Sequence, residues 1–146
     1  MKMKATPLLL AGLLLSPLTA VAGEVSTAIL ANGSASWDGG SIQYVEGTPE
    51  LTVQQIKVEA GGELVSLPVH CHRMPLAAYV AKGSVRVVKS SGEEHLFRAG
   101  NAFIEVMGQW HKGTFVEPTE LIVFYAGAKG APLSIKQGEA SAQACN

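Results

Sequence analysis

After about residue 40, the chain alternates between short apolar segments and turn-forming residues. The apolar segments are rich in Val, Ile, Phe, Tyr and Thr, which favour strands, whereas the Gly and Pro between them favour turns. No helical repeat continues through these segments. We therefore predict about ten short strands, at residues 42–45, 51–58, 64–69 running into 72, 77–80, 84–89, 95–98, 102–106, 111–116, 121–125 and 133–136.

This succession of short strands predicts an all-β fold. Turns at intervals of about 8–12 residues are typical of an antiparallel sandwich or a closed barrel. One hairpin is indicated by Ser90-Ser91-Gly92-Glu93, because glycine supplies the positive φ that a tight reversal needs. We predict one barrel domain over residues 41–137. The Gly- and Ser-rich lead-in at 23–40 is expected to lie over its outside or against a partner chain, and the tail at 138–146 is expected to be flexible.

The first 22 residues have the pattern of an export signal. Lys2 and Lys4 give a basic start, an apolar run follows over residues 8–18, and Ala20-Val21-Ala22 provides the small residues that a signal peptidase needs. The apolar run is shorter than the roughly 20 residues that span a bilayer, and Pro17 interrupts it. We therefore predict cleavage after Ala22 and an exported protein, either periplasmic or secreted.

Charge and hydropathy argue against two classes of partner. The formal net charge is −1 and Lys and Arg are scattered along the chain, so the sequence predicts no nucleic-acid surface. After the leader, no apolar run is long enough to enter a membrane. The expected partner of the mature domain is a small-molecule ligand or substrate.

Three of the four histidines are spaced as ligands of one metal ion. His70 and His72 are two residues apart in a predicted strand, so both imidazoles should face one side and Cys71 the other. His111 follows a predicted strand and a Gly-containing turn that can bring it opposite this pair. An isolated pair of this kind is more often half-buried or solvated, but a second histidine segment favours a metal site. His95 is expected to be an exposed hairpin residue.

These segments resemble the two paired motifs of the cupin superfamily. The stretch Pro68-Val69-His70-Cys71-His72, continuing to Gly83, resembles the first motif, and Gly100 through Gly108 to His111 resembles the second. The resemblance covers roughly residues 50–127. It implies a double-stranded β-helix, which is the jelly-roll barrel of cupins, with the three histidines on one metal. It implies little about the reaction, because cupins include oxygenases, isomerases, decarboxylases and non-catalytic proteins.

The sequence departs from the cupin pattern at the expected acidic ligand. The first motif usually supplies a glutamate just beyond its second histidine, and here that region reads Arg73-Met74-Pro75-Leu76-Ala77. Val106 also replaces the usual proline of the second motif. A divalent ion held by neutral ligands keeps its full charge and favours an anionic neighbour or substrate. Glu105 is the candidate for this ligand or for a catalytic base, and a solvent-facing strand acid is the alternative.

Four further residues are candidates for a substrate pocket. Tyr79 and Trp110 are aromatic residues suited to a pocket mouth, although such residues more often pack at strand ends. Arg86 and Gln55 have side chains that can bind a carboxylate or oxyanion, although a solvated strand face is their simpler interpretation.

Two classes of function compete. The first is a metal-dependent enzyme, an oxygenase or lyase for a small molecule, because the site resembles the three-histidine sites of thiol and diketone dioxygenases. The second is a non-catalytic module that binds or senses a metal or small ligand, which the missing glutamate favours. A scaffold with vestigial histidines is a third interpretation. Iron or manganese is the favoured divalent metal, with zinc, nickel and copper as alternatives. Metal affinity is expected to fall below about pH 6.5, where free histidine is protonated.

Cys71 and Cys145 are the only cysteines, and an exported chain allows them to form one disulfide. Cys145 is one residue from the end of the tail, which shifts the balance slightly towards two free thiols. Cupin barrels often pair through an edge strand, so the resemblance also implies a homodimer.

Overall fold

The computed structural model describes residues 23–60 and 65–145, so the predicted export signal lies outside the described residues. Within these ranges the chain forms nine strands and one short 3-10 helix. They are β1 (Pro49–Val58), β2 (His70–Cys71), β3 (Leu76–Lys82), β4 (Ser84–Lys89), β5 (Glu94–Arg98), β6 (Ala102–Ile104), β7 (His111–Phe115), β8 (Thr119–Ala128), β9 (Ile135–Lys136) and η1 (Ala140–Ala144).

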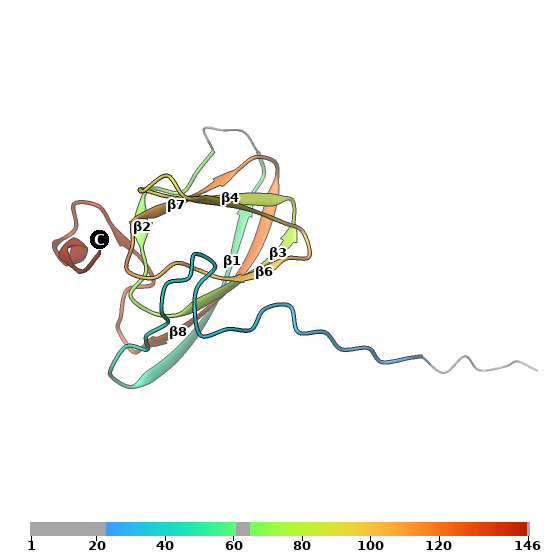
Figure 1. Ribbon diagram of the computed structural model, residues 1–146, viewed down its shortest axis with the longest axis horizontal. Coiled ribbons are helices and arrows are strands. Elements are labelled where there is room, and N and C mark those ends of the chain that lie inside the picture. The colour runs from blue at the N-terminus through green and yellow to red at the C-terminus, as the bar shows by residue number, and fades with distance from the viewer. Residues whose placement is uncertain (1–22, 61–64, 146) are drawn as a thin grey trace, which may run out of the picture.

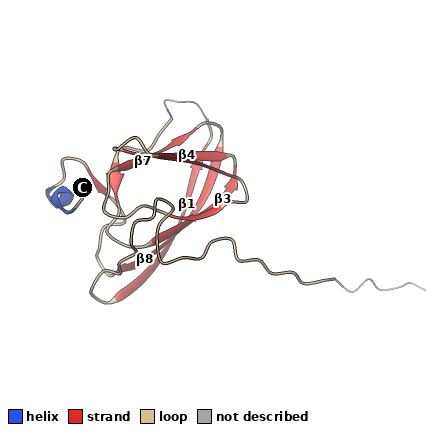
Figure 2. Ribbon diagram, viewed as in Figure 1, coloured by secondary structure: helices blue, strands red, loops and turns tan. Residues whose placement is uncertain are grey.

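Two antiparallel sheets face each other across the core (Figures 1 and 2). One sheet has the order β1-β8-β3-β6 and the other has the order β5-β4-β7-β2-β9. Neighbours in each sheet are mostly distant in sequence, as in a jelly roll, where the chain crosses repeatedly between layers. The prediction of an all-β jelly-roll barrel is confirmed. No helix of the described ranges is long and apolar enough to cross a membrane.

The core lies between the sheets because the inward side chains of each strand are apolar. In β4, Val85 and Val87 are 2% exposed and alternate with outward residues. Phe97 and Phe103 stack from β5 and β6, with ring centroids 3.7 Å apart. Burying each such side chain contributes about 1.5–3 kcal/mol, so this layer supplies much of the force that closes the barrel.

Gly83 makes the tight reversal from β3 to β4. Its φ is +72°, a conformation that L residues rarely adopt, and a Cβ there would collide with the carbonyl oxygen of Pro118. The glycine of the first motif is therefore required by the backbone.

Two predicted strands differ from the structure. Residues 42–45 form no strand, since the only pairing nearby is an isolated bridge between Ala35 and Ser41. Of the predicted strand at 64–72, residues 65–72 are described. Residues 65–67 pair with β7 only through an isolated bridge between Ser66 and Thr114 and two backbone hydrogen bonds, and the regular strand is confined to β2. Pro68 lacks the amide hydrogen that a continuous ladder needs at that point.

The lead-in lies partly over the outside of the barrel, as expected, and partly packs against the core. Trp37 packs against the core, and Ser36 is buried. The Asp38 carboxylate lies 2.6 Å from the ammonium nitrogen of Lys89, which is itself 8% exposed and also contacts Glu93 at 2.8 Å. A buried ion pair thus holds this loop against β4. Residues 29–31 line a hollow with Tyr79 and Phe124 on the outside of the four-stranded sheet, whereas residues 23–28 are exposed and extend away from the barrel (Figure 1).

The tail is attached to the barrel. Cys71 and Cys145 form a disulfide, with their Cα atoms 6.3 Å apart, so the expectation of two free thiols is wrong. The bridge packs with Ile135 and Trp110 on the outside of the five-stranded sheet, and η1 precedes it. Sequence could not show this, because 74 residues separate the two sulfurs along the chain.

Apolar side chains remain exposed on the outer face of β1 and β8. Leu51, Val53 and Phe124 are 82%, 64% and 49% exposed, and Val53 lies directly opposite Phe124 across the two strands. The homodimer stays a prediction.

Candidate metal centre

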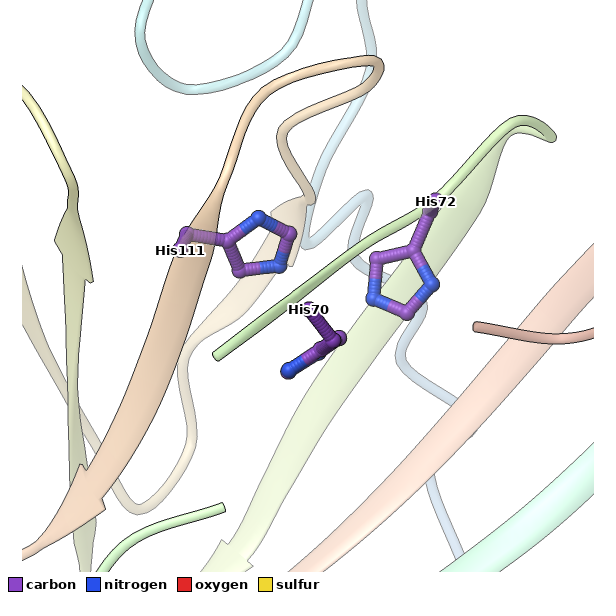
Figure 3. Close-up of side chains that lie close together, drawn as sticks. All are labelled: His70, His72 and His111. Carbon is purple, nitrogen blue, oxygen red and sulfur yellow. The ribbon is translucent and has the colours of Figure 1, made fainter. Parts of the chain in front are cut away.

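Strand register brings the three histidines together. His70 in β2 lies directly opposite His111 in β7, and residues opposite each other in antiparallel strands project from the same face. His72 is two residues further along, so its ring returns to that face. Ring centroids are 4.6 Å apart for His70 and His111, 4.8 Å for His70 and His72, and 5.2 Å for His72 and His111. Figure 3 shows the three rings grouped between β2 and β7.

Backbone carbonyls fix the orientation of all three rings. Nδ1 of His70 lies 2.7 Å from the carbonyl oxygen of Pro68. Nδ1 of His72 lies 2.7 Å from the carbonyl oxygen of Leu133, and Nδ1 of His111 lies 2.9 Å from that of Gln109. A carbonyl oxygen can only accept, so each Nδ1 must donate its hydrogen. Each neutral ring then keeps a free lone pair on Nε2, which is the arrangement of metal-binding histidines in proteins.

The potential ligand atoms of the three rings all lie within 4.8 Å of one another. Nε2 of His111 is buried and has no hydrogen-bond partner among the described residues. An unmatched buried acceptor costs about 1–3 kcal/mol, which a bound cation would offset. The three histidines are therefore positioned to hold a divalent metal ion.

Burial keeps these rings neutral. Burial, together with the nearby His70 and His111, lowers the pKa of His72 to about 3, although the hydrogen bond to the Leu133 carbonyl partly opposes this shift. Burial likewise lowers the pKa of His70 and of His111, both of which are at most 9% exposed. Protons therefore begin to compete with a metal at a lower pH than the value near 6.5 expected from free histidine. The decline of metal affinity with falling pH stays a prediction, and the lowered pKa values favour an onset below about pH 6.5.

The histidines line a small cavity inside the barrel, of about 50 Å³. Its remaining walls are mainly apolar side chains from both sheets. A wider cavity of about 430 Å³ shares His70, His72 and Tyr125 with it and forms a mouth. The histidines thus line a small inner cavity that adjoins the wider mouth.

Glu105 lines the same inner cavity and is 7% exposed, so it is not a solvent-facing strand acid. Its Oε1 accepts hydrogen bonds from Nε1 of Trp37 at 3.0 Å and from the backbone N–H of Val106 at 2.8 Å. Burial raises the pKa of Glu105, and these two bonds partly offset the rise. Glu105 lies outside the cluster of potential ligand atoms, so the structure places it beside the histidines and not among them.

The other expected pocket residues lie elsewhere, except Gln55. Gln55 lines the mouth, where its amide donates to the Glu120 carboxylate. Tyr79 lines neither cavity, because it alternates with the inward Ala78 and Val80 in β3 and so faces outward.

Arg86 and Trp110 also line neither cavity. Arg86 alternates with the inward valines of β4, and its Nε lies 4.0 Å from Oε1 of Glu94. Trp110 packs on the disulfide at the outside of the sheet. In contrast, His95 is exposed as expected, with its ring near Trp37 and Phe97.

Sequence reasoning missed two residues of the site. Tyr125 lines both cavities, and its alternation with the buried Leu121 and Val123 in β8 is the signal that could have indicated an inward side chain. Trp37, in the lead-in loop, donates a hydrogen bond to Glu105, which is far from it in sequence. No local pattern indicates that contact.

No protein-family model matches the chain, and no curated protein matches it. Among solved structures, the DMSP lyase DddQ from Ruegeria pomeroyi DSS-3 aligns with a TM-score of 0.50 and 17% identity, over 61% of this chain and 45% of the lyase. A 3,4-ketoisomerase from Helicobacter canadensis aligns with a TM-score of 0.50 and 12% identity, over 63% and 72% of the two chains. An RmlC-like cupin from Shewanella frigidimarina aligns with a TM-score of 0.47 and 20% identity, over 68% and 95%.

The chain therefore has the fold of the cupin superfamily, as its two facing antiparallel sheets also indicate. It spans under half the length of the lyase. At these identities the likeness concerns the fold, and the chemistry has to be argued from the site.

Removing a ligand should remove the metal. We expect the purified protein to bind about one divalent ion per chain, and His70→Ala and His111→Ala to lose it. The loss in affinity should exceed the roughly 10–100-fold typical of residues that only orient a ligand. His95→Ala is the matched control, because this histidine lies outside the cluster. Elemental analysis of the four proteins measures the effect, and equal metal in all four would exclude this centre.

The metal-free protein should become less stable as pH falls from about 6.5 towards 3. Histidines of the unfolded chain take up protons near about pH 6.5, whereas burial shifts proton uptake by the folded protein to lower pH. Between these two pH values, each buried histidine lowers the free energy of unfolding by up to about 1.4 kcal/mol for each pH unit of acidification. Denaturant unfolding of the wild type and of His72→Leu measures the slope. The variant should lose less stability on acidification, and equal slopes would contradict the lowered pKa of His72.

Proposed function

We propose that this chain is an exported metal-dependent enzyme that acts on a small molecule, with lyase or oxygenase chemistry. The observation that carries the proposal is the convergence of three Nε2 lone pairs, one of them buried and unpartnered, in a cavity with an adjoining mouth. Among the described residues the cluster supplies three protein ligands, which leaves coordination positions for a substrate or water.

His70, His72 and His111 would hold the metal. A bound divalent ion supplies Lewis-acid polarisation of a substrate oxygen, or redox chemistry if it is iron, manganese or copper. Iron and manganese are favoured, and zinc and nickel also suit imidazole ligands. The apolar walls exclude water, which strengthens the interaction of the buried charges with a substrate.

Glu105 is the candidate general base. Both of its hydrogen bonds go to Oε1, and no hydrogen bond of the described residues uses Oε2. Burial raises its pKa, and a carboxylate with a raised pKa accepts a substrate proton more readily than an ordinary one. Proton transfer of this kind requires no oxidant and therefore favours a lyase over an oxygenase.

A non-catalytic binding or sensing module is the second candidate. The feature that favours it is the composition of the ligand cluster, which has no carboxylate. In that case Glu105 would balance the charge of the ion through space and transfer no proton.

Turnover should depend on both the metal and Glu105. We expect the metal-loaded protein to convert at least one member of a panel of small thiols, phenols, diketones and carboxylates, with substrate loss followed by NMR. Glu105→Gln should retain the metal and lose about 10²–10⁴-fold in kcat, because it keeps the shape of the side chain without its basicity. The matched control is Glu94→Gln, an exposed acid on β5.

Running the panel in air and under nitrogen separates the two reaction classes. Conversion that persists under nitrogen supports a lyase, and conversion that stops with loss of oxygen uptake supports an oxygenase. Binding of panel members without any conversion would favour the non-catalytic module. Full activity in Glu105→Gln would exclude the general-base role.

Export is supported by the leader pattern and by the disulfide between Cys71 and Cys145, since such bonds persist mainly in oxidising compartments. We expect the protein recovered from the periplasm or medium of a secreting bacterial host to begin at Gly23. Its intact mass should be that of residues 23–146 less two hydrogens, and reduction should restore both. A protein that retains its first 22 residues in the cytoplasm would contradict export.

A further inference from the structure

The mouth outside the metal cavity has a marked chemical bias. Two of its lining residues carry a full charge, and both are cations, Lys57 and Lys136. No aspartate or glutamate belongs to its lining within the described part of the chain. A molecule that enters the mouth therefore meets positive charge before it reaches the histidines.

Strand register directs Lys136 towards the site. In β9, Lys136 lies directly opposite His70, which in turn lies opposite His111 on the other side of β2. Side chains directly opposite in antiparallel strands share a face, so the lysine leaves the sheet on the same side as the metal ligands. Its neighbour Ile135 pairs with Cys71 and packs on the disulfide at the other face, because successive residues of a strand point to opposite faces.

Two donor groups of the mouth, the ammonium group of Lys136 and the amide N–H groups of Gln54, have no acceptor among the described residues, whereas the amide of Gln55 donates to the Glu120 carboxylate. No ion pair of the described residues involves the ammonium group of Lys136, and the nearby Glu139 carboxylate accepts instead from the backbone N–H of Lys136 at 3.2 Å. Across the mouth, Oε1 of Gln54 accepts a hydrogen bond from the Tyr125 hydroxyl at 3.1 Å. This bond directs the carbonyl end of the Gln54 amide to the tyrosine and leaves its N–H donors for a ligand.

We infer that this mouth, with Lys136 as its main charged group, binds the carboxylate of a short-chain organic acid. The ammonium group and the Gln54 amide together supply charge-assisted and neutral hydrogen bonds to one carboxylate. The inner cavity of about 50 Å³ is only a few times the roughly 10–15 Å³ that is needed to hold one water molecule, so only a few atoms of the substrate can reach the histidines. The acid group would stay in the mouth while the other end of the molecule faces the metal centre.

That this carboxylate belongs to the substrate of the enzyme rests on the proposed function, but the binding of a carboxylate in the mouth can be tested separately. Mature protein is prepared both loaded with zinc and stripped of metal. Each form is titrated with propanoate, butanoate, pentanoate and hexanoate and with the corresponding primary amides, and dissociation constants are taken from ligand-observed NMR. The variants are Lys136→Met and, as a matched control, Lys129→Met, an exposed lysine outside the mouth.

Both forms of the wild type should bind at least one acid about tenfold more tightly than its amide. Lys136→Met should weaken acid binding about fivefold, as expected for a partly exposed ion pair, and should leave amide binding and zinc content unchanged. Lys129→Met should match the wild type. Acid binding that is undetectable, equal to amide binding, or unchanged in Lys136→Met would overturn the inference. Absence of bound zinc in the wild type would reject the metal centre alone, because the metal-free titration still tests the mouth.

Discussion

The pairing of β2 with β7, which places His70 directly opposite His111, is the constraint on which the candidate site depends. Because β2 is paired on both edges, with β7 and with β9, the same register also places Lys136 beside the histidines and Ile135 beside the disulfide. A shift of β2 by one residue would turn His70 and Cys71 to the opposite faces and so separate them from their partners in β7, β9 and the tail. The short strand β2 thus fixes the metal ligands, the mouth and the attachment of the tail together.

Burial of polar groups is the second feature that links structure to chemistry. The three imidazoles are buried where protonation is unfavourable, and their donors are matched by carbonyl oxygens, so the unmatched atoms are the ones that can bind a cation. Glu105 is buried beside them, and its negative charge favours a cation in the same cavity. A folded protein retains such a costly cluster more readily when a ligand offsets the cost.

The lead-in loop and the tail complete the site from outside the regular sheets. Trp37 holds one oxygen of Glu105, and the adjoining Asp38 is tied to Lys89 by a short ion pair. At the other side, the disulfide secures β2 to the end of the chain. Both contacts join segments far apart in sequence, so local patterns gave no indication of Trp37 and weighed against the disulfide.

Local alternation and turn chemistry determined what could be predicted from the sequence. They were sufficient for the all-β fold, for most strands from β1 to β8, and for the three histidines, because the spacing of His70 and His72 implies a shared face in any strand. They could not determine which face of a strand is inward, and so three of the four expected pocket residues, Tyr79, Arg86 and Trp110, lie away from the cavity. Strand register, the burial of Glu105 and the convergence of Lys136 on the mouth were decided by the tertiary structure, since they depend on pairing between segments that the chain brings together only on folding.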